Sequence, residues 1–310
     1  MGNGKTQKYS FRAEPFLVDG LKRKYLTDNI SKAITMAMQD ILAPTTAENL
    51  EIKPLFPILG SKSKTMVQRI LKIMPEHTTY VEPFAGAGAV LIAKPESNVE
   101  IYNDLNGRLC NLLRIVKSQP LEFYLKCNEL FISESLLMEQ KHITEFDSAL
   151  DDAVNYFYLM AISIYGDCKS LKHGFGTNMF KSYKKRLDLV DILSKRLENV
   201  TMFNRDFSYI IRKYDSPNTL FYCDPPYFGK EGYYSEKFTR EQHQQLSEIL
   251  KGIKGKFILS YYAKTQIYRL YRSRRIYHIS YRTRRNSGYS KMVTEKLICN
   301  FEFGGSKPLL

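Results

Sequence analysis

The sequence contains no tryptophan, and its five cysteines form no C-x-x-C pair. Scattered cysteines, odd in number, argue against a disulfide framework and against structural zinc, and they favour a reducing compartment such as the cytoplasm. No apolar run is long enough to cross a bilayer, and no secretory hydrophobic segment precedes a cleavage site. We therefore expect no membrane association, no metal and a cytoplasmic location.

Acidic residues are also in deficit, with 32 Asp and Glu against 46 Lys and Arg, which gives a formal net charge of +14. This excess favours a polyanionic partner such as nucleic acid, although a basic surface without that role is the alternative. Because tryptophan is missing, stacking on bases would fall to the 22 tyrosines and 18 phenylalanines. The 310 residues, 44% of them hydrophobic, suffice for one large domain with a substantial insertion.

The most informative motif that is present is Asp224-Pro225-Pro226-Tyr227, which follows the apolar run 220–223. It lies at the predicted carboxyl end of a buried strand, where open α/β sheets bind their ligands. Proline has no backbone N–H, so the Asp224 carboxylate and the Pro225 carbonyl are two acceptors aimed at one region. Two acceptors suit a substrate –NH2 group, and Tyr227 offers a flat face to the ring that carries it. The alternative is a strand that ends in a proline turn with a surface acid.

A glycine loop lies upstream, where residues 80–92 read as a strand, a tight turn and a helix start. Gly86 and Gly88 match part of a dinucleotide-binding fingerprint, but Leu91 stands where a third glycine is expected. Asp104 ends the next predicted strand, about 20 residues on, where an acid can hold ribose hydroxyls. Asp104 could also be the N-cap of the helix that follows. The missing glycine favours an adenosine ligand smaller than a dinucleotide.

Together these blocks resemble the Dam-like (alpha) group of adenine-specific DNA N6-methyltransferases. The matching blocks are residues 58–62, 82–88, 103–106 and 223–227, in that order, with weaker similarity at 204–207 and 294–300. The first block departs from the family's W-A-G-G-K pattern at Ile58 and Ser61. The resemblance spans most of the chain after residue 55, and the joint order is far more specific than any one block.

The resemblance implies an α/β fold, namely a Rossmann-like S-adenosylmethionine-dependent methyltransferase sheet of seven strands, the last antiparallel, with an inserted, mostly helical target-recognition domain. It implies S-adenosylmethionine as methyl donor and adenine in double-stranded DNA as acceptor. By position, the target base would be bound by Asp224, Pro225, Pro226 and Tyr227. The cofactor would be bound by Lys62, Glu82, Phe84, Gly86, Gly88, Asp104, Asp206 and Phe207.

The same resemblance divides the chain into an N-terminal extension (1–50, with a helix expected at 25–42), a catalytic domain (51–109 and 197–310) and a target-recognition domain (110–196). A loop expected at 166–182 and its exit mix basic and aromatic residues, which suits contact with phosphates and bases. We assign DNA contact there to Lys181, Lys184 and Lys185, and at the tip of a closing hairpin to Arg282, Arg284 and Arg285. A solvated basic loop is the alternative for both.

The expected reaction is direct transfer of a methyl group to the N6 amine of an adenine flipped out of the duplex, without a covalent enzyme intermediate. Cys223 is expected in the core, which disfavours cytosine-C5 chemistry. Cytosine N4, an RNA base or a protein amide stay open as acceptors, and so does a catalytically silent DNA-binding module. A nicotinamide oxidoreductase is opposed by the missing third glycine. A bacterial protein of this kind would associate with the nucleoid, with or without a partner restriction enzyme.

Overall fold

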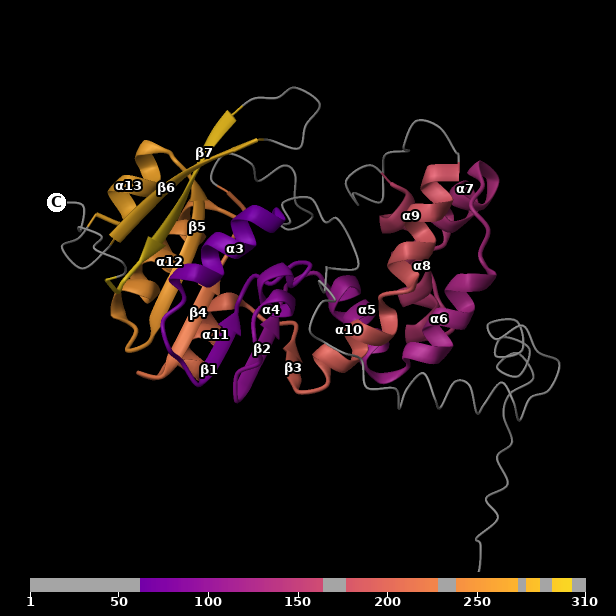
Figure 1. Ribbon diagram of the computed structural model, residues 1–310, viewed down its shortest axis with the longest axis horizontal. Helices are drawn as coiled ribbons and strands as arrows, with labels where there is room; N and C mark the ends of the chain where they lie inside the picture. The colour runs from indigo at the N-terminus through magenta and orange to yellow at the C-terminus, as the bar shows by residue number, and fades with distance from the viewer. Residues whose placement is uncertain (1–61, 164–176, 228–237, 273–276, 285–291, 303–310) are drawn as a thin grey trace, which may run out of the picture.

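The computed structural model describes residues 62–163, 177–227, 238–272, 277–284 and 292–302. These residues form a mixed sheet with helices on both faces and a group of helices beside it (Figure 1). The helix expected at 25–42 lies outside the described residues. Within them, no helix combines the length and the apolar character needed to cross a membrane.

The sheet has seven strands in the order β3-β2-β1-β4-β5-β7-β6. The strands are β1 (Thr79–Glu82), β2 (Val99–Asn103), β3 (Val200–Phe203), β4 (Thr219–Cys223), β5 (Lys256–Tyr262), β6 (Tyr277–Arg284) and β7 (Met292–Cys299). The first five are parallel, whereas β7 runs antiparallel to both β5 and β6. The expected α/β sheet with an antiparallel last strand and a closing hairpin is thus confirmed.

Each face of the sheet is covered by its own helices. One core contains α3 (Lys64–Ile73), α4 (Ala89–Ala93) and α5 (Gly107–Ser118), and the other contains α11 (Phe207–Tyr214), α12 (Arg240–Gly252) and α13 (Thr265–Leu270). Along β4, Leu220 and Tyr222 join the first core while Phe221 and Cys223 join the second. All five residues of β4 are buried, which explains its uninterrupted apolar sequence.

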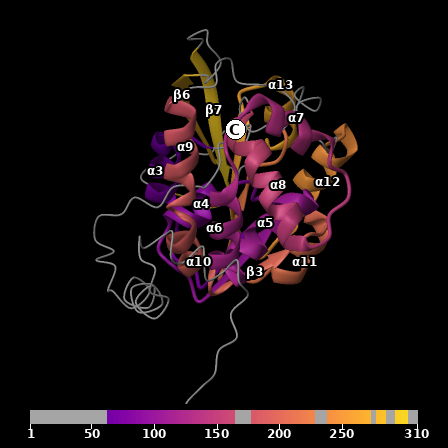
Figure 2. The same ribbon diagram turned by 90° about the vertical axis from the view of Figure 1, so that its right-hand side faces the viewer.

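The helical group continues the first core away from the sheet. Its members are α6 (Pro120–Glu129), α7 (Glu134–His142), α8 (Ala149–Ile162), α9 (Thr177–Leu187) and α10 (Val190–Leu197). From the side of this group, α6, α7, α8 and α9 lie in front of the sheet (Figure 2). The centre is α8, where every residue from Ala153 to Ile162 is buried against its neighbours.

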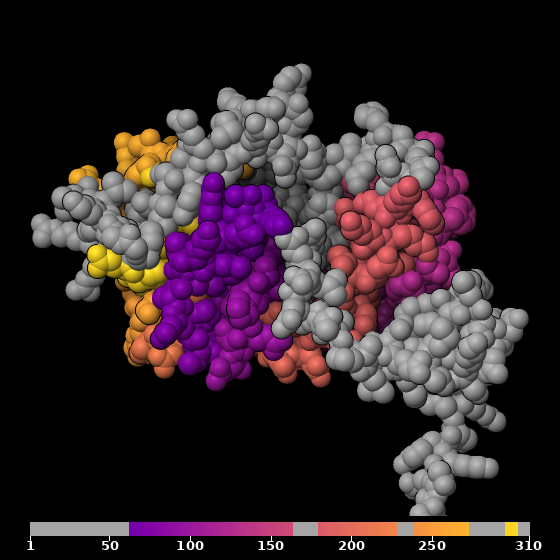
Figure 3. All heavy atoms as spheres, viewed as in Figure 1, coloured from indigo at the N-terminus to yellow at the C-terminus, as the bar shows by residue number. Residues whose placement is uncertain are grey.

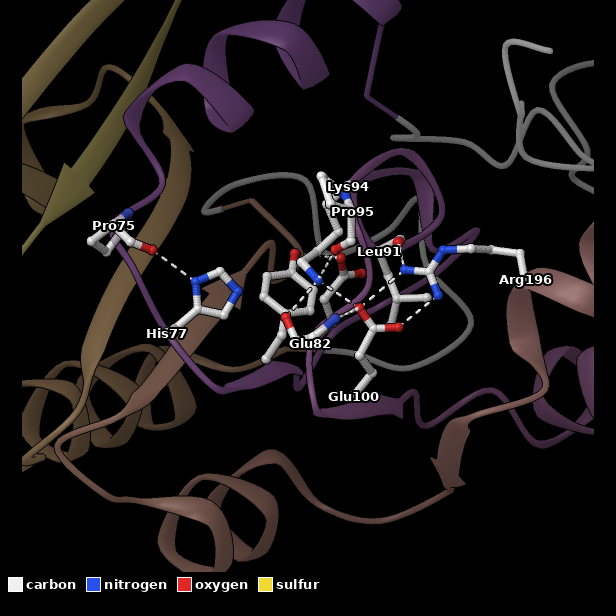
Figure 4. Close-up of polar contacts among 10 residues, drawn as sticks. Pro75, His77, Glu82, Leu91, Lys94, Pro95, Glu100 and Arg196 are labelled. Carbon is white, nitrogen blue, oxygen red and sulfur yellow. Dashed lines mark hydrogen bonds and ion pairs between the residues drawn. The ribbon is translucent and has the colours of Figure 1, made fainter. Parts of the chain in front are cut away.

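A buried ion network joins α10 to the sheet (Figure 4). Arg196 donates from Nη1 to Glu100 Oε2 at 2.6 Å and from Nη2 to Glu100 Oε1 at 3.0 Å, and its Nη2 also reaches the Leu91 carbonyl. Lys94 Nζ donates to Glu100 Oε1 at 2.5 Å. The three side chains are at most 6% exposed, so their charges depend on one another for solvation.

Candidate active site

The predicted glycine turn lies between β1 and α4 and approaches β2. Gly86 and Gly88 have φ of +51° and +65°, the left-handed region that favours glycine, and Gly88 is the N-cap of α4. Tyr102 donates its hydroxyl to the Gly86 carbonyl at 2.7 Å. A Cβ placed on Gly86 would meet no atom within 4 Å, so there is open space beside the turn.

Asp104 holds this turn from the end of β2. Its Oδ2 accepts the Gly86 N–H at 2.8 Å, and its Oδ1 accepts the Asn106 N–H at 2.9 Å. The alternative that Asp104 caps α5 is wrong, because the N-cap is Asn106, whose Oδ1 accepts the Leu109 N–H. Burial raises the pKa of Asp104, and the two backbone donors offset part of that rise.

Aromatic residues gather beside the turn, where β1 and β3 end. Phe84 stacks on Phe207 with ring centroids 5.1 Å apart, and Phe238 packs edge-on against Phe84 at 5.5 Å. Asp206 is exposed and caps α11 by accepting the Ser208 N–H at 2.8 Å. Phe207 is only 1% exposed, so it supports Phe84 from below and offers no open face itself.

Glu82, the last residue of β1, is 1% exposed and accepts the Tyr80 hydroxyl at 2.7 Å. Burial raises its pKa to about 8, although the bond from Tyr80 works in the opposite direction. At neutral pH this carboxyl group is therefore mostly protonated. Glu82 lies inside the protein under the glycine turn, with the Asp224 charge as one contributor to its raised pKa.

The D-P-P-Y block surrounds a lysine. Lys62 Nζ lies 2.7 Å from Asp224 Oδ1, 2.5 Å from the Tyr227 hydroxyl oxygen and 2.8 Å from Glu295 Oε1. The Tyr227 hydroxyl in turn donates to Glu295 Oε1 at 2.7 Å. One ammonium is thus paired with two carboxylates, and the exposed fractions of the two side chains are 18% for Asp224 and 9% for Glu295. The structure places Lys62 against this block, whereas the sequence associated it with the cofactor.

The electrostatics follow from burial and from these neighbours. Burial works to lower the pKa of Lys62, but its acidic neighbours, Asp224 foremost and Glu295 after it, together outweigh burial, and the pKa lies well above the ordinary lysine value. Burial raises the pKa of Asp224, and Lys62 counters part of this rise while Glu295 adds to it. Lys62 is therefore charged, and it favours the ionised form of Asp224.

The Tyr227 ring is not exposed, contrary to the expectation from the sequence. It is 7% exposed and packs edge-on against Tyr262, with ring centroids 4.5 Å apart. The reason is that Glu295 and Lys62 hold its hydroxyl, and β5 pairs Tyr262 with Glu295 in register. Cys223 is fully buried, as expected, and burial raises the pKa of its thiol far above neutrality.

The comparisons with known proteins decide the family. Residues 59–284 match the model of the D12 class N6 adenine-specific DNA methyltransferases. The chain belongs to this family. A DNA adenine methylase of Escherichia coli K12 is 29% identical over 203 residues, covering 61% of this chain and 72% of the relative.

Two further relatives of this adenine-specific methyltransferase are also named as methylating enzymes. A DNA adenine methylase of Vibrio cholerae is 24% identical over 260 residues, 76% of this chain and 92% of its own. The type II methyltransferase M.CviBI of Paramecium bursaria Chlorella virus NC1A is 25% identical over 231 residues, 71% and 86% of the two chains. A solved rRNA methyltransferase from Streptomyces viridochromogenes has 9% identity and a TM-score of 0.35, covering 84% and 95%.

The methyltransferase carries its predicted DNA-contacting lysines on a helix rather than in a loop. Lys181 and Lys185 are exposed on α9, whose atoms lie at the surface of the helical group (Figure 3). Lys184 is less available for an outside contact, because its ammonium already donates a hydrogen bond to Asn128 Oδ1. Tyr183, one of the aromatic residues at the exit of the expected loop, is 1% exposed and donates to the Cys127 carbonyl, so it belongs to the core.

The arginines of the closing hairpin also differ from expectation. Arg282 and Arg284 lie within β6, in register with Thr294 and Met292, and not at a loop tip. Arg285 lies outside the described residues, as does most of the basic loop expected at 166–182. β6 continues as far as Arg284, so both arginines are part of the strand.

Sequence reasoning missed Glu295 and Asn103 as parts of the methyltransferase site. Asn103 is fully buried at the end of β2, where its amide donates to the Pro83 carbonyl and to the Arg205 carbonyl, each at 2.9 Å. It thereby ties the glycine loop to the start of α11. The available signal was that both residues lie in segments that resemble the family, 103–106 and 294–300.

Proposed function

We propose that this adenine-specific DNA methyltransferase binds S-adenosylmethionine beside the glycine turn and methylates the N6 amine of an adenine flipped out of double-stranded DNA. The observation that carries the proposal is the position of Asp224. Its carboxylate lies at the carboxyl end of β4, next to β1 and its glycine turn, and 18% of its side chain is exposed. A substrate amine can therefore reach an acceptor that is largely enclosed by protein.

The residues around the turn fit an adenosine-containing donor. Both glycines have positive φ, and Gly86 has open space beside its backbone, which allows close approach of a ligand. Asp104 uses one lone pair of each oxygen for Gly86 and Asn106, and each oxygen has another with which to accept a ribose hydroxyl. Phe84, supported by Phe207, offers a ring to the adenine. Bound there, the donor supplies an activated methyl group on a sulfonium.

The acceptor side needs positioning more than it needs a base. The lone pair of an exocyclic adenine amine is delocalised into the ring, so the amine is a poor nucleophile. Hydrogen bonds from its two N–H groups to the Asp224 carboxylate and the Pro225 carbonyl favour a pyramidal nitrogen with its lone pair aimed at the methyl. Positioning of this kind supplies several kcal/mol of barrier lowering. Flipping of the base is required because the amine is otherwise stacked inside the duplex.

The function is tested by transfer of labelled methyl from S-adenosylmethionine to double-stranded DNA that lacks adenine methylation, followed by nucleoside analysis. We expect N6-methyladenine. N4-methylcytosine would move the reaction to the other base, and label in an RNA or protein control alone would reassign the substrate. Donor binding without any product would indicate a silent DNA-binding module.

The first prediction concerns Asp104. Asp104→Ala removes the acceptors for two backbone N–H groups and for the proposed ribose hydroxyl. We expect the affinity for S-adenosylmethionine to fall by about 10- to 100-fold, because a lost charge-assisted hydrogen bond costs roughly 1.5–3 kcal/mol. Calorimetric titration measures the affinity. Asp147→Ala, which removes an exposed acid from the helical group, is the control. Unchanged affinity in Asp104→Ala would place the donor elsewhere.

The second prediction concerns the proposed DNA contacts of α9. The double substitution of Lys181 and Lys185 by Gln should weaken DNA binding at all sequences and flatten its salt dependence. The slope of log K against log salt is negative, and each lost phosphate contact reduces its magnitude by about 0.9. Fluorescence anisotropy at several salt concentrations measures the slope. Lys251→Gln, which removes an exposed charge from α12, is the matched control and should leave it unchanged.

Arg282, Arg284 and Arg285 form a separate arm of the same experiment. If the edge strand β6 contacts the backbone of DNA, their joint replacement by Gln should also reduce the magnitude of the salt slope. A slope equal to that of the wild type in either set would remove that set from the interface, and the two sets can fail independently.

A further inference from the structure

A charged group that the proposed reaction does not use, the Lys62 ammonium, lies against the D-P-P-Y block. Lys62 reaches the Asp224 oxygen at 2.7 Å, which is the acceptor that the amine of the target base needs. An ammonium that donates to a carboxylate is a chemical likeness of an amine that donates to it. In the free protein, therefore, the place of the substrate amine at Asp224 Oδ1 is taken.

A second carboxylate lies ready for the same ammonium. Glu295 Oε1 is 2.8 Å from Lys62 Nζ, and it lies on β7, which β5 separates from β4. Glu295 is 7% exposed, and an isolated charge buried to this extent is costly unless it is paired. Lys62 can thus release Asp224 and still keep a counter-ion, without crossing open solvent.

We propose that Lys62 and Glu295 form an exchangeable counter-ion for Asp224: the ammonium covers the carboxylate until the base amine displaces it, and it then stays paired with Glu295. This deepens the proposed function and rests on it. The Tyr227 hydroxyl, which accepts from Lys62 and donates to Glu295, keeps the two in place during the exchange. Lys62 and Glu295 are positioning residues here, since both act through Asp224.

The exchange explains how a buried carboxylate stays both ionised and accessible. Uncovered and unpaired, Asp224 would tend to take up a proton and would then present a donor where the amine needs an acceptor. With the ammonium 2.8 Å away on Glu295, a positive charge stays near while the neutral amine occupies Asp224. Two carboxylates and one ammonium leave a net negative charge, which suits a neighbouring cationic donor.

The test compares two variants with the wild type by the pH dependence of kcat/KM for double-stranded DNA lacking adenine methylation. Lys62→Met removes the charge that lowers the pKa of Asp224, so the acidic limb should move to higher pH. Glu295→Gln keeps an acceptor for Tyr227 but removes a charge that raises this pKa, so the limb should move to lower pH. We expect opposite shifts, each of about one pH unit. A merely structural role predicts a lower rate without opposite shifts.

The other titratable groups around Asp224 behave differently in this range. The hydroxyls of Tyr222 and Tyr227 are buried and stay neutral, because burial raises both pKa values well above 10. Burial raises the pKa of Glu82 to about 8, and neither substitution touches this carboxyl group directly. Its contribution is therefore common to all the profiles.

Steady-state constants supply a second readout. In Glu295→Gln the ammonium has lost its alternative partner and holds Asp224 more firmly, so KM for DNA should rise about tenfold while kcat changes less. Lys62→Arg keeps the charge but can hold the carboxylate through two N–H groups, so it should also raise KM, with the limb left in place. Lys72→Gln, an exposed lysine in the last turn of α3, is the control and should match the wild type.

Each result decides between named alternatives. Limbs that move in the same direction, or that do not move, overturn the exchange. Loss of donor affinity of more than about tenfold in Lys62→Met would assign the lysine to the cofactor instead. If Lys62→Met fails to fold, two expectations still test the exchange. The acidic limb of the pH profile should move to lower pH in Glu295→Gln and should stay in place in Lys62→Arg. A wild-type protein that methylates no adenine would refute the proposed function before any of these comparisons.

Discussion

Replacing Asp224 by alanine should abolish methyl transfer while leaving the donor bound. The substitution removes the acceptor that would orient the amine, and Lys62 stays paired with Glu295, so no buried charge is orphaned. We expect kcat/KM to fall by at least about a thousandfold, within the range lost when a positioned catalytic group is removed. Transfer of labelled methyl to DNA measures the rate, and calorimetric titration measures donor affinity.

The control for this prediction is Asp147→Ala, which removes an exposed carboxylate far from β4 and should transfer methyl at the wild-type rate. A parallel loss of donor affinity and rate in Asp224→Ala would show that Asp224 shapes the donor site and does not act on the base. A rate within tenfold of the wild type would remove Asp224 from the reaction altogether.

Replacing Arg196 by methionine should produce the largest loss of stability among the substitutions considered. Glu100 would keep only Lys94 as a charged partner, and its Oε2, which accepts from Arg196 Nη1, would lose that donor in the core. Removing one partner of a buried ion pair costs about 3–5 kcal/mol. Differential scanning calorimetry measures the effect, and a loss of this size lowers Tm by roughly 5–8 °C in a protein of this length.

A matched control lies one residue away. Lys195 pairs with Asp191 at 3.3 Å on the surface of α10, with both side chains more than one-third exposed. Lys195→Met should therefore change the free energy of unfolding by no more than about 0.5 kcal/mol. If Arg196→Met were as mild as Lys195→Met, the buried network would contribute little to holding α10 against the sheet.

The same network predicts how stability depends on pH. Burial opposes ionisation of Glu100, but Arg196 and Lys94 outweigh it and hold its pKa below the ordinary 4.5. A lowered carboxyl pKa gives stability that is fully present above 4.5 and is lost as the pH falls through the native value. In Arg196→Met this acid-dependent part should shrink, which thermal unfolding between about pH 3 and 7 would show.

The sequence located the strands well because their signal is local. Three of the strands, 79–82, 200–203 and 219–223, have the bounds that their short local runs indicate. Thr239 caps α12 through a capping box with Gln242, which is also a local pattern. The glycines of the turn adopt positive φ, as a tight turn between strand and helix requires.

Other features depended on contacts between distant segments, which no local pattern contains. Asp104 looked like a helix cap because it precedes a helix, but Asn106 took that role and left Asp104 to hold Gly86. Lys181 looked like a loop residue because glycines precede it, yet α9 begins at Thr177 and carries it. Tyr227 looked exposed because it follows two prolines, but β5 and β7 enclose its ring.

The sequence by itself determined the class of fold and the family. These rest on short-range patterns, namely apolar runs, glycine turns and the D-P-P-Y block, and on their order along the chain. The tertiary structure alone decided which charges meet at Asp224. Lys62, Asp224 and Glu295 come from three distant segments of the chain. Only the pairing of β5 with β7 and the packing of the segment before α3 bring the two carboxylates within 3 Å of the Lys62 ammonium.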